Sequence, residues 1–107
     1  MMIAFYYYLF LAFSQAPSTA DLMIRVACKV PTQWYLVGIM LQIETSTLNS
    51  FKAQTDDQVV LFIMVFDQWK REDKIPYTWS TIITALDTVG EKKTASELKE
   101  WLMTCSH

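Results

Sequence analysis

The side chains that could act as nucleophiles, general bases or metal ligands are few in this chain and far apart. The only histidine, His107, is the last residue, and the two cysteines, Cys28 and Cys105, are widely separated. No serine, cysteine or threonine has a histidine or an acid at a spacing typical of nucleophilic catalysis. Two glycines are too few for a phosphate-binding loop. We therefore expect a protein that is not an enzyme, with no catalytic residue, no cofactor and no metal ligand.

The spacing of Cys28 and Cys105 matches no metal-binding motif, which leaves two free thiols or one disulfide. Free thiols are typical of a reducing compartment, and small secreted domains usually carry more cysteines than this chain does. We interpret both cysteines as free thiols, with the disulfide as the alternative.

A stretch without charge is the first candidate for contact with a protein partner. Residues 59–66 read VVLFIMVF, although a surface helix normally buries only one apolar stripe. If Phe62 and Phe66 face inward, three other apolar side chains face solvent beside Asp67 and form a contact patch. The alternative is that another part of the chain, such as the charge-free residues 3–13, covers them. The three expected patch residues are Val60, Ile63 and Met64.

A run of five charged residues follows this stretch and is the second candidate. The run carries both signs, so its side chains could pair with charges on a partner. The alternative is a hydrated helix end, because exposed ion pairs contribute little to stability or binding. The residues of the run are Lys70, Arg71, Glu72, Asp73 and Lys74.

Length and composition predict one helical domain around these candidates. The 107 residues suit a single domain, and two glycines and three prolines are too few for the many tight turns of an all-β fold. A formal net charge of −2, with both signs interspersed, gives no basic surface for nucleic acid. Apolar residues recur at helical spacing and predict six helices, over residues 18–30, 31–43, 44–54, 55–73, 78–90 and 94–104.

Residue types that begin helices support several of these boundaries. Thr55 with Gln58, and Thr94 with Glu97, have the spacing of capping boxes. Thr78 is expected to cap the helix that follows it, since a threonine oxygen accepts hydrogen bonds from the first free backbone N–H groups.

Prolines and glycines indicate where helices end or approach each other. Pro31 should end the first helix, because it disfavours helical backbone in the residue before it. Gly90 is a typical helix stop. Gly38 lies inside a predicted helix, where it costs about 1 kcal/mol relative to alanine, so we expect a neighbouring helix to approach closely there. We interpret the four tryptophans on the apolar stripes as core residues: Trp34, Trp69, Trp79 and Trp101.

The order of these apolar positions resembles that of the death domain, a six-helix module of intracellular signalling proteins. The most specific part is the motif W…TW..I..AL…G….A..L, which runs from Trp69 to Leu98. The resemblance covers residues 20–103, approximately. The matching positions are Leu22, Val26, Ala27, Val30, Trp34, Val37, Leu41, Ile43, Leu48, Phe51, Val65, Phe66, Trp69, Thr78, Trp79, Ile82, Ala85, Leu86, Gly90, Ala95 and Leu98.

The resemblance implies an all-α fold, a six-helix antiparallel bundle of the death-domain type, over residues 18–104. It also implies a function without chemistry, in which the module binds other death-domain proteins or itself during apoptotic or innate-immune signalling. Such a chain would be cytoplasmic and act as an adaptor or as a competitor. Gln42 and residues 75–77 depart from the family pattern, which affects the partner surface more than the fold.

The N-terminal residues 1–17 have no counterpart in that module. They carry no charge, and the apolar run from Met1 to Phe13 is too short to span a bilayer as a helix. The run is similar to the core of a signal peptide, although it lacks a basic start. It could equally be a surface arm or a non-native start. The alternative function is therefore a small secreted helical bundle that acts as a carrier or ligand, and contact with a membrane is expected only through this segment.

Overall fold

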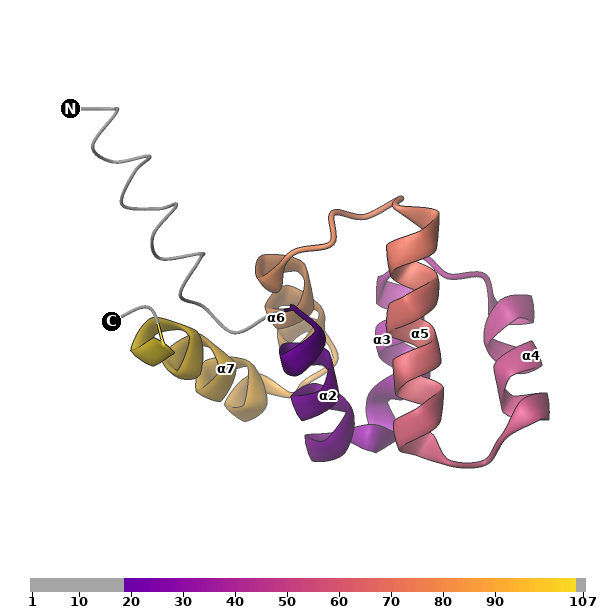
Figure 1. Ribbon diagram of the computed structural model, residues 1–107, viewed down its shortest axis with the longest axis horizontal. Coiled ribbons are helices and arrows are strands. Elements are labelled where there is room, and N and C mark those ends of the chain that lie inside the picture. Colours follow the sequence, from indigo (N-terminus) through magenta and orange to yellow (C-terminus); the bar gives the residue numbers. More distant parts are fainter. Residues whose placement is uncertain (1–18, 106–107) are drawn as a thin grey trace.

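The computed structural model describes residues 19–105, with side chains from Ala20 to Thr104, and these residues form helices and no strand (Figure 1). The six helices expected from the apolar spacing are confirmed. Ser18 and the charge-free residues 1–17 lie outside the described residues. In chain order the elements are α2 (Thr19–Lys29), the 3-10 helix η1 (Pro31–Gln33), α3 (Trp34–Met40), α4 (Thr45–Gln54), α5 (Gln58–Glu72), α6 (Trp79–Thr88) and α7 (Lys92–Cys105).

Helix α5 is the centre of the bundle. It packs against α2, α3 and α4, and Figure 1 shows it between α4 on one side and α2 and α3 on the other. Helices α6 and α7 pack against each other at the end of the molecule opposite α4. Each of the six α-helices contributes buried side chains to one hydrophobic cluster, so the described part of the chain has a single core.

Three of the four tryptophans are core residues, as expected. Trp34, Trp69 and Trp79 are buried, whereas Trp101 is half-buried at the edge of the core. The indole Nε1 of Trp69 donates a hydrogen bond to the carbonyl oxygen of Ile75 at 2.8 Å. Trp69 thereby ties the segment after α5 to the core, which brings the chain to the start of α6.

The expected ends of α2 and α6 are confirmed. Helix α2 stops at Lys29, and Pro31 then begins η1. After α6, Gly90 adopts a left-handed backbone with φ 94°. Its N–H donates to the carbonyl oxygen of Asp87, and the next N–H donates to that of Leu86, which is the Schellman arrangement of a helix C-terminus.

Of the three expected helix starts, only the cap at Thr78 is confirmed. Its hydroxyl accepts a hydrogen bond from the N–H of Thr81 at 3.3 Å. The expected capping box of Thr94 and Glu97 is wrong, because α7 begins at Lys92 and Thr94 is already buried inside it. The Schellman turn at Gly90 redirects the chain within two residues, so the helix restarts earlier than the apolar pattern indicates.

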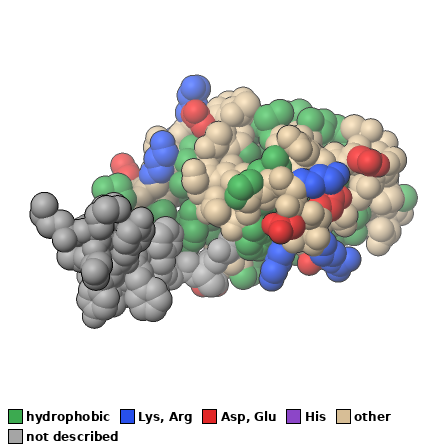
Figure 2. Space-filling model, turned by 90° about the horizontal axis from the view of Figure 1, so that it is seen from above, with side chains coloured by type: hydrophobic (Ala, Val, Ile, Leu, Met, Phe, Trp, Pro, Cys, Tyr) green, Lys and Arg blue, Asp and Glu red, His purple; other side chains and the backbone are tan. Residues whose placement is uncertain are grey.

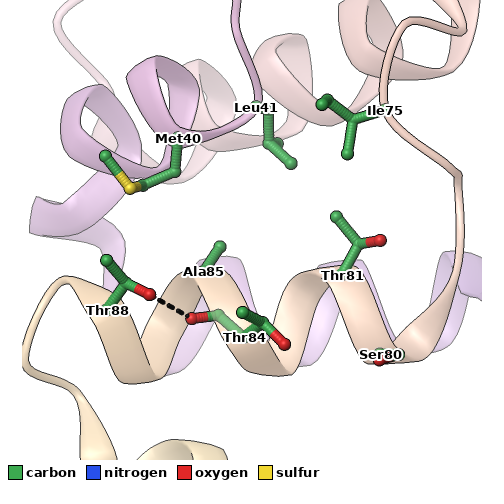
Figure 3. Close-up of a pocket in the computed structure, with 8 residues that line it drawn as sticks. All are labelled: Met40, Leu41, Ile75, Ser80, Thr81, Thr84, Ala85 and Thr88. Carbon is green, nitrogen blue, oxygen red and sulfur yellow. Dashed lines mark hydrogen bonds between the residues drawn. The ribbon is translucent and has the colours of Figure 1, made fainter.

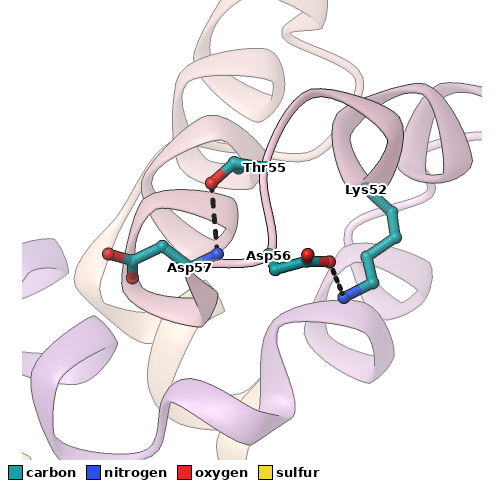
Figure 4. Close-up of polar contacts among 4 residues, drawn as sticks. All are labelled: Lys52, Thr55, Asp56 and Asp57. Carbon is teal, nitrogen blue, oxygen red and sulfur yellow. Dashed lines mark hydrogen bonds and ion pairs between the residues drawn. The ribbon is translucent and has the colours of Figure 1, made fainter.

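The capping box of Thr55 and Gln58 is also wrong, because Asp57 caps α5. Its carboxylate accepts hydrogen bonds from the N–H groups of the two residues that follow Gln58, at 3.0 and 3.3 Å. Thr55 instead accepts a hydrogen bond from the N–H of Asp57, and the neighbouring Asp56 pairs with Lys52 (Figure 4). Asp57 therefore caps α5, whereas the adjacent Asp56 forms an ion pair with α4.

Gly38 has the close neighbour that the sequence predicts. A Cβ atom at this position would lie 2.7 Å from Cδ2 and 3.2 Å from Cδ1 of Leu48, on α4. Leu48 is fully buried, so any shift of its side chain would have to be absorbed by the packed core around it. Glycine therefore lets α3 and α4 approach each other at this point.

Candidate interaction surface

Four side chains on the outward face of α5 form a row that we call the α5 stripe: Val60, Ile63, Asp67 and Arg71. Their spacing of three, four and four residues places them on one face of a helix. Val60 is 42% exposed and Ile63 is 43% exposed. Both residues belong to the expected contact patch, and the structure places them at the surface as predicted.

The charged half of the α5 stripe is an ion pair. Nη2 of Arg71 lies 2.7 Å from Oδ2 of Asp67, one turn away, and both side chains are more than half exposed. An acid that precedes a base by four residues is the favourable order on a helix. The stripe thus joins two aliphatic side chains to a charged pair along one helix face.

Met64 does not belong to the exposed patch, which corrects the sequence-based expectation. Its side chain is half-buried and packs against the core. Leu61 is fully buried as well. Because α5 has neighbours on two sides, it buries more than the single stripe of an ordinary surface helix. Substitution of Met64 by lysine would therefore disturb packing, so it is no clean test of the surface.

The charged run at the end of α5 is engaged within the chain. Oε1 of Glu72 lies 3.6 Å from Nζ of Lys74, and its other carboxylate oxygen accepts a hydrogen bond from Gln68 at 2.8 Å. Asp73 has a left-handed backbone with φ 52°, and its N–H donates to the carbonyl oxygen of Trp69, which ends the helix. These contacts leave Val60 and Ile63 as the stronger candidates for a partner contact.

Lys70, the remaining residue of the run, lies over the aromatic ring of Tyr77, which follows α5 in the chain. Its Nζ is 5.8 Å from the ring centroid of Tyr77, and the Tyr77 ring lies 4.6 Å from that of Trp69. Burial raises the pKa of the Tyr77 hydroxyl, and the negative charge of Asp67 raises it further. Tyr77 lies in the segment between α5 and α6, and the path of residues 73–78 brings it against α5. Helical spacing does not predict the path of such a segment, so it could not predict this contact.

A second surface feature lies between α2 and α7. The guanidinium of Arg25 stacks over the ring of Trp101 at 3.7 Å from its centroid, and Lys29 forms an ion pair with Glu97. Trp101 also meets the ring of Trp79 at 5.8 Å. These contacts join the first described helix to the last one, and we interpret them as structural.

The residues considered for chemistry are not brought together in the described part of the chain. Cys28 is exposed on α2, while the side chains of Cys105 and His107 are outside the described residues. No group of three or more His, Cys, Asp or Glu side chains in residues 20–104 could hold a metal ion. Within the same described residues, no helix has the length and apolarity needed to cross a membrane.

No protein-family model, curated protein sequence or solved structure matches the chain. The resemblance to death domains therefore rests on the order of residues alone. Figure 2 shows hydrophobic side chains reaching the surface between groups of Lys, Arg, Asp and Glu side chains. The α5 stripe likewise combines exposed apolar side chains with charged ones.

Proposed function

We propose that the chain is a non-enzymatic protein–protein interaction module of the death-domain type. It binds other death-domain proteins, or a second copy of itself, through the α5 stripe. In the cytoplasm it acts as an adaptor, or as a competitor that occupies partners, in apoptotic or innate-immune signalling. The number and order of the helices agree with what the residue pattern implies and support the proposal.

The exposure of Val60 and Ile63 is the observation that carries this proposal. Full burial of such an aliphatic side chain is worth about 1.5–3 kcal/mol, so covering the exposed part of each contributes about 1 kcal/mol to binding. The neighbouring ion pair between Asp67 and Arg71 supplies opposite charges at the rim, which orient a partner more than they tighten its binding. Aliphatic side chains with a charged edge are suited to a specific protein contact.

Substitution of Ile63 by aspartate tests the proposal. The full-length protein is measured against a panel of purified death domains by biolayer interferometry, and its self-association by sedimentation velocity. We expect the wild type to bind at least one of these partners and Ile63→Asp to lose that binding. Circular dichroism should show an unchanged fold, because Ile63 is at the surface.

Met103 on α7 provides the matched control, since it is also a large apolar side chain and is 65% exposed. Met103→Asp introduces the same charge on another helix and should bind as the wild type does. Equal loss in both variants would point to a general effect of charge. A wild type that binds no death domain and stays monomeric would contradict the proposed function.

The charge-free sequence of residues 1–13 favours a second candidate, a secreted helical carrier or ligand. The intact mass and location of the chain, tagged at its C-terminus and expressed in eukaryotic cells, separate the two candidates. Full mass in the cytosol supports the signalling module. A chain shortened near Ala16 and found in the medium supports the secreted protein.

A further inference from the structure

A groove between α3 and α6 is lined by two walls of different chemistry. Met40, Leu41 and Ile75 form an apolar wall, and hydroxyl-bearing residues of α6, among them Thr81 and Thr84, form the other (Figure 3). The groove has a volume of about 290 Å³. A water molecule occupies roughly 30 Å³ in the liquid, so the groove has room for an aromatic side chain.

The groove and the helix face beside it carry no charge. Its lining residues come from positions 40–41, 75 and 80–88, and none of them is charged, although Asp87 lies in the last of these stretches. The groove continues into an exposed apolar face of α3 formed by Leu36, Ile39 and Met40. Since 19% of all residues in the chain are charged, an uncharged lining beside the uncharged residues 31–43 makes a locally neutral surface. A charged occupant would lose its hydration there without gaining a partner.

The chain itself contains an occupant of matching chemistry. Residues 1–18 include no charged residue and are rich in phenylalanine and tyrosine, with three consecutive tyrosines at positions 6–8. Aromatic rings suit the apolar wall, and tyrosine hydroxyls can exchange hydrogen bonds with the threonines of α6.

Length does not prevent this contact. Eighteen residues extend to roughly 60 Å at about 3.3 Å each. The longest dimension of the molecule is 51 Å. The segment joins α2 at Thr19 and can therefore reach the groove on the same molecule.

We propose that residues 1–18 dock into the α3–α6 groove of their own chain. This inference goes beyond the proposed function, because it concerns a different face of the bundle and does not depend on the α5 stripe. Docking hides the neutral face of α3 together with the apolar N-terminal segment.

Site-specific photocrosslinking in the full chain, verified by intact mass, tests the proposal. Benzoylphenylalanine replaces Thr84 on the hydroxyl wall of the groove, and crosslinked peptides of the monomer fraction are identified by mass spectrometry. We expect crosslinks from position 84 to residues 1–18. Ser50 is the matched control, because it is also an exposed hydroxyl-bearing residue on a helix but lies on α4, at the end of the molecule opposite α6 (Figure 1), and the probe at that position should not reach the docked segment.

A charge on the opposite wall provides the second measurement. Met40→Lys places an ammonium group in the groove, and the yield of the crosslink should fall by about tenfold or more, because burial of an unpaired charge is strongly unfavourable. Met40 is exposed, so circular dichroism should stay unchanged. An unchanged yield, crosslinks formed only between two copies, or equal crosslinking from position 50 would each overturn the proposal.

Discussion

Replacement of Asp57 by alanine should destabilise the protein by removing the cap of its central helix. The Asp57 carboxylate accepts hydrogen bonds from the N–H groups of Val59 and Val60 at 3.0 and 3.3 Å. These two groups lie in the first turn of α5, where the helix itself offers them no acceptor. Alanine at position 57 leaves both of them to water.

The expected loss follows from the exposure of this turn. Loss of an aspartate cap costs about 0.5–2 kcal/mol, and the middle of that range applies because water can reach the freed N–H groups. Asp57 is exposed, so its removal leaves no cavity. We expect the free energy of unfolding to fall by about 1 kcal/mol and the Tm by about 4–8 °C for a domain of this size.

Urea denaturation followed by tryptophan fluorescence measures this loss. Asp56→Ala is the matched control, because it removes a neighbouring carboxylate that pairs only with Lys52 at the surface. Its midpoint should equal that of the wild type within error. Thr55→Val tests the capping box that the sequence indicates. If Asp56→Ala or Thr55→Val loses as much stability as Asp57→Ala, the assignment of the cap is wrong.

Three further outcomes are expected. Trp69→Ala should lower the free energy of unfolding by about 3–5 kcal/mol in the same assay, because it empties a large buried site and frees the Ile75 carbonyl. Gly90→Ala should cost about 1–2 kcal/mol through left-handed backbone strain alone, since nothing lies within 4 Å of a Cβ there, and Gly90→Asn should cost less. The pKa of Asp56, lowered from 3.8 by the hydrogen bond and then the charge of Lys52, should return towards 3.8 in Lys52→Gln, as measured by NMR. Because Asp56 is fully exposed, solvent screening keeps the contribution of this pair too small to shift the urea midpoint; it is present above pH 3.8 and is lost as the pH falls through the lowered pKa.

Periodicity predicts this fold well where a helix buries one stripe. Helix α6 is such a case: Trp79, Ile82 and Leu86 recur at helical spacing, and all three are buried. The cap at Thr78 and the stop at Gly90 then mark the limits of that helix. Both signals are local, so the sequence contains them in full.

Periodicity fails in α5, where apolar residues occur on nearly every side. The sequence correctly indicates that Val60 and Ile63 face outward, but it assigns Met64 to the same side and leaves Leu61 unassigned. Which of these side chains is covered depends on how α2, α3 and α4 surround α5, and residue spacing carries no information about that. The same reason hides the contact between Lys70 and Tyr77, which lie on different segments.

Helix starts were the least predictable feature, because several polar residues near a boundary can accept the same N–H groups. Thr55 and Asp57 both have suitable side chains and extended backbones, but α5 begins at Gln58, so only Asp57 stands directly before the helix. The spacing of Thr55 and Gln58 predicts a capping box, whereas in the structure the cap is Asp57.

The contact between Gly38 and Leu48 has a consequence for evolution. We expect a relative with alanine at the first position to carry a smaller side chain at the second, because the buried leucine could shift only into the packed core. The two positions should therefore vary together, ten residues apart, even where the rest of the chain has diverged. This size-coupled pair would identify distant relatives that overall sequence comparison misses.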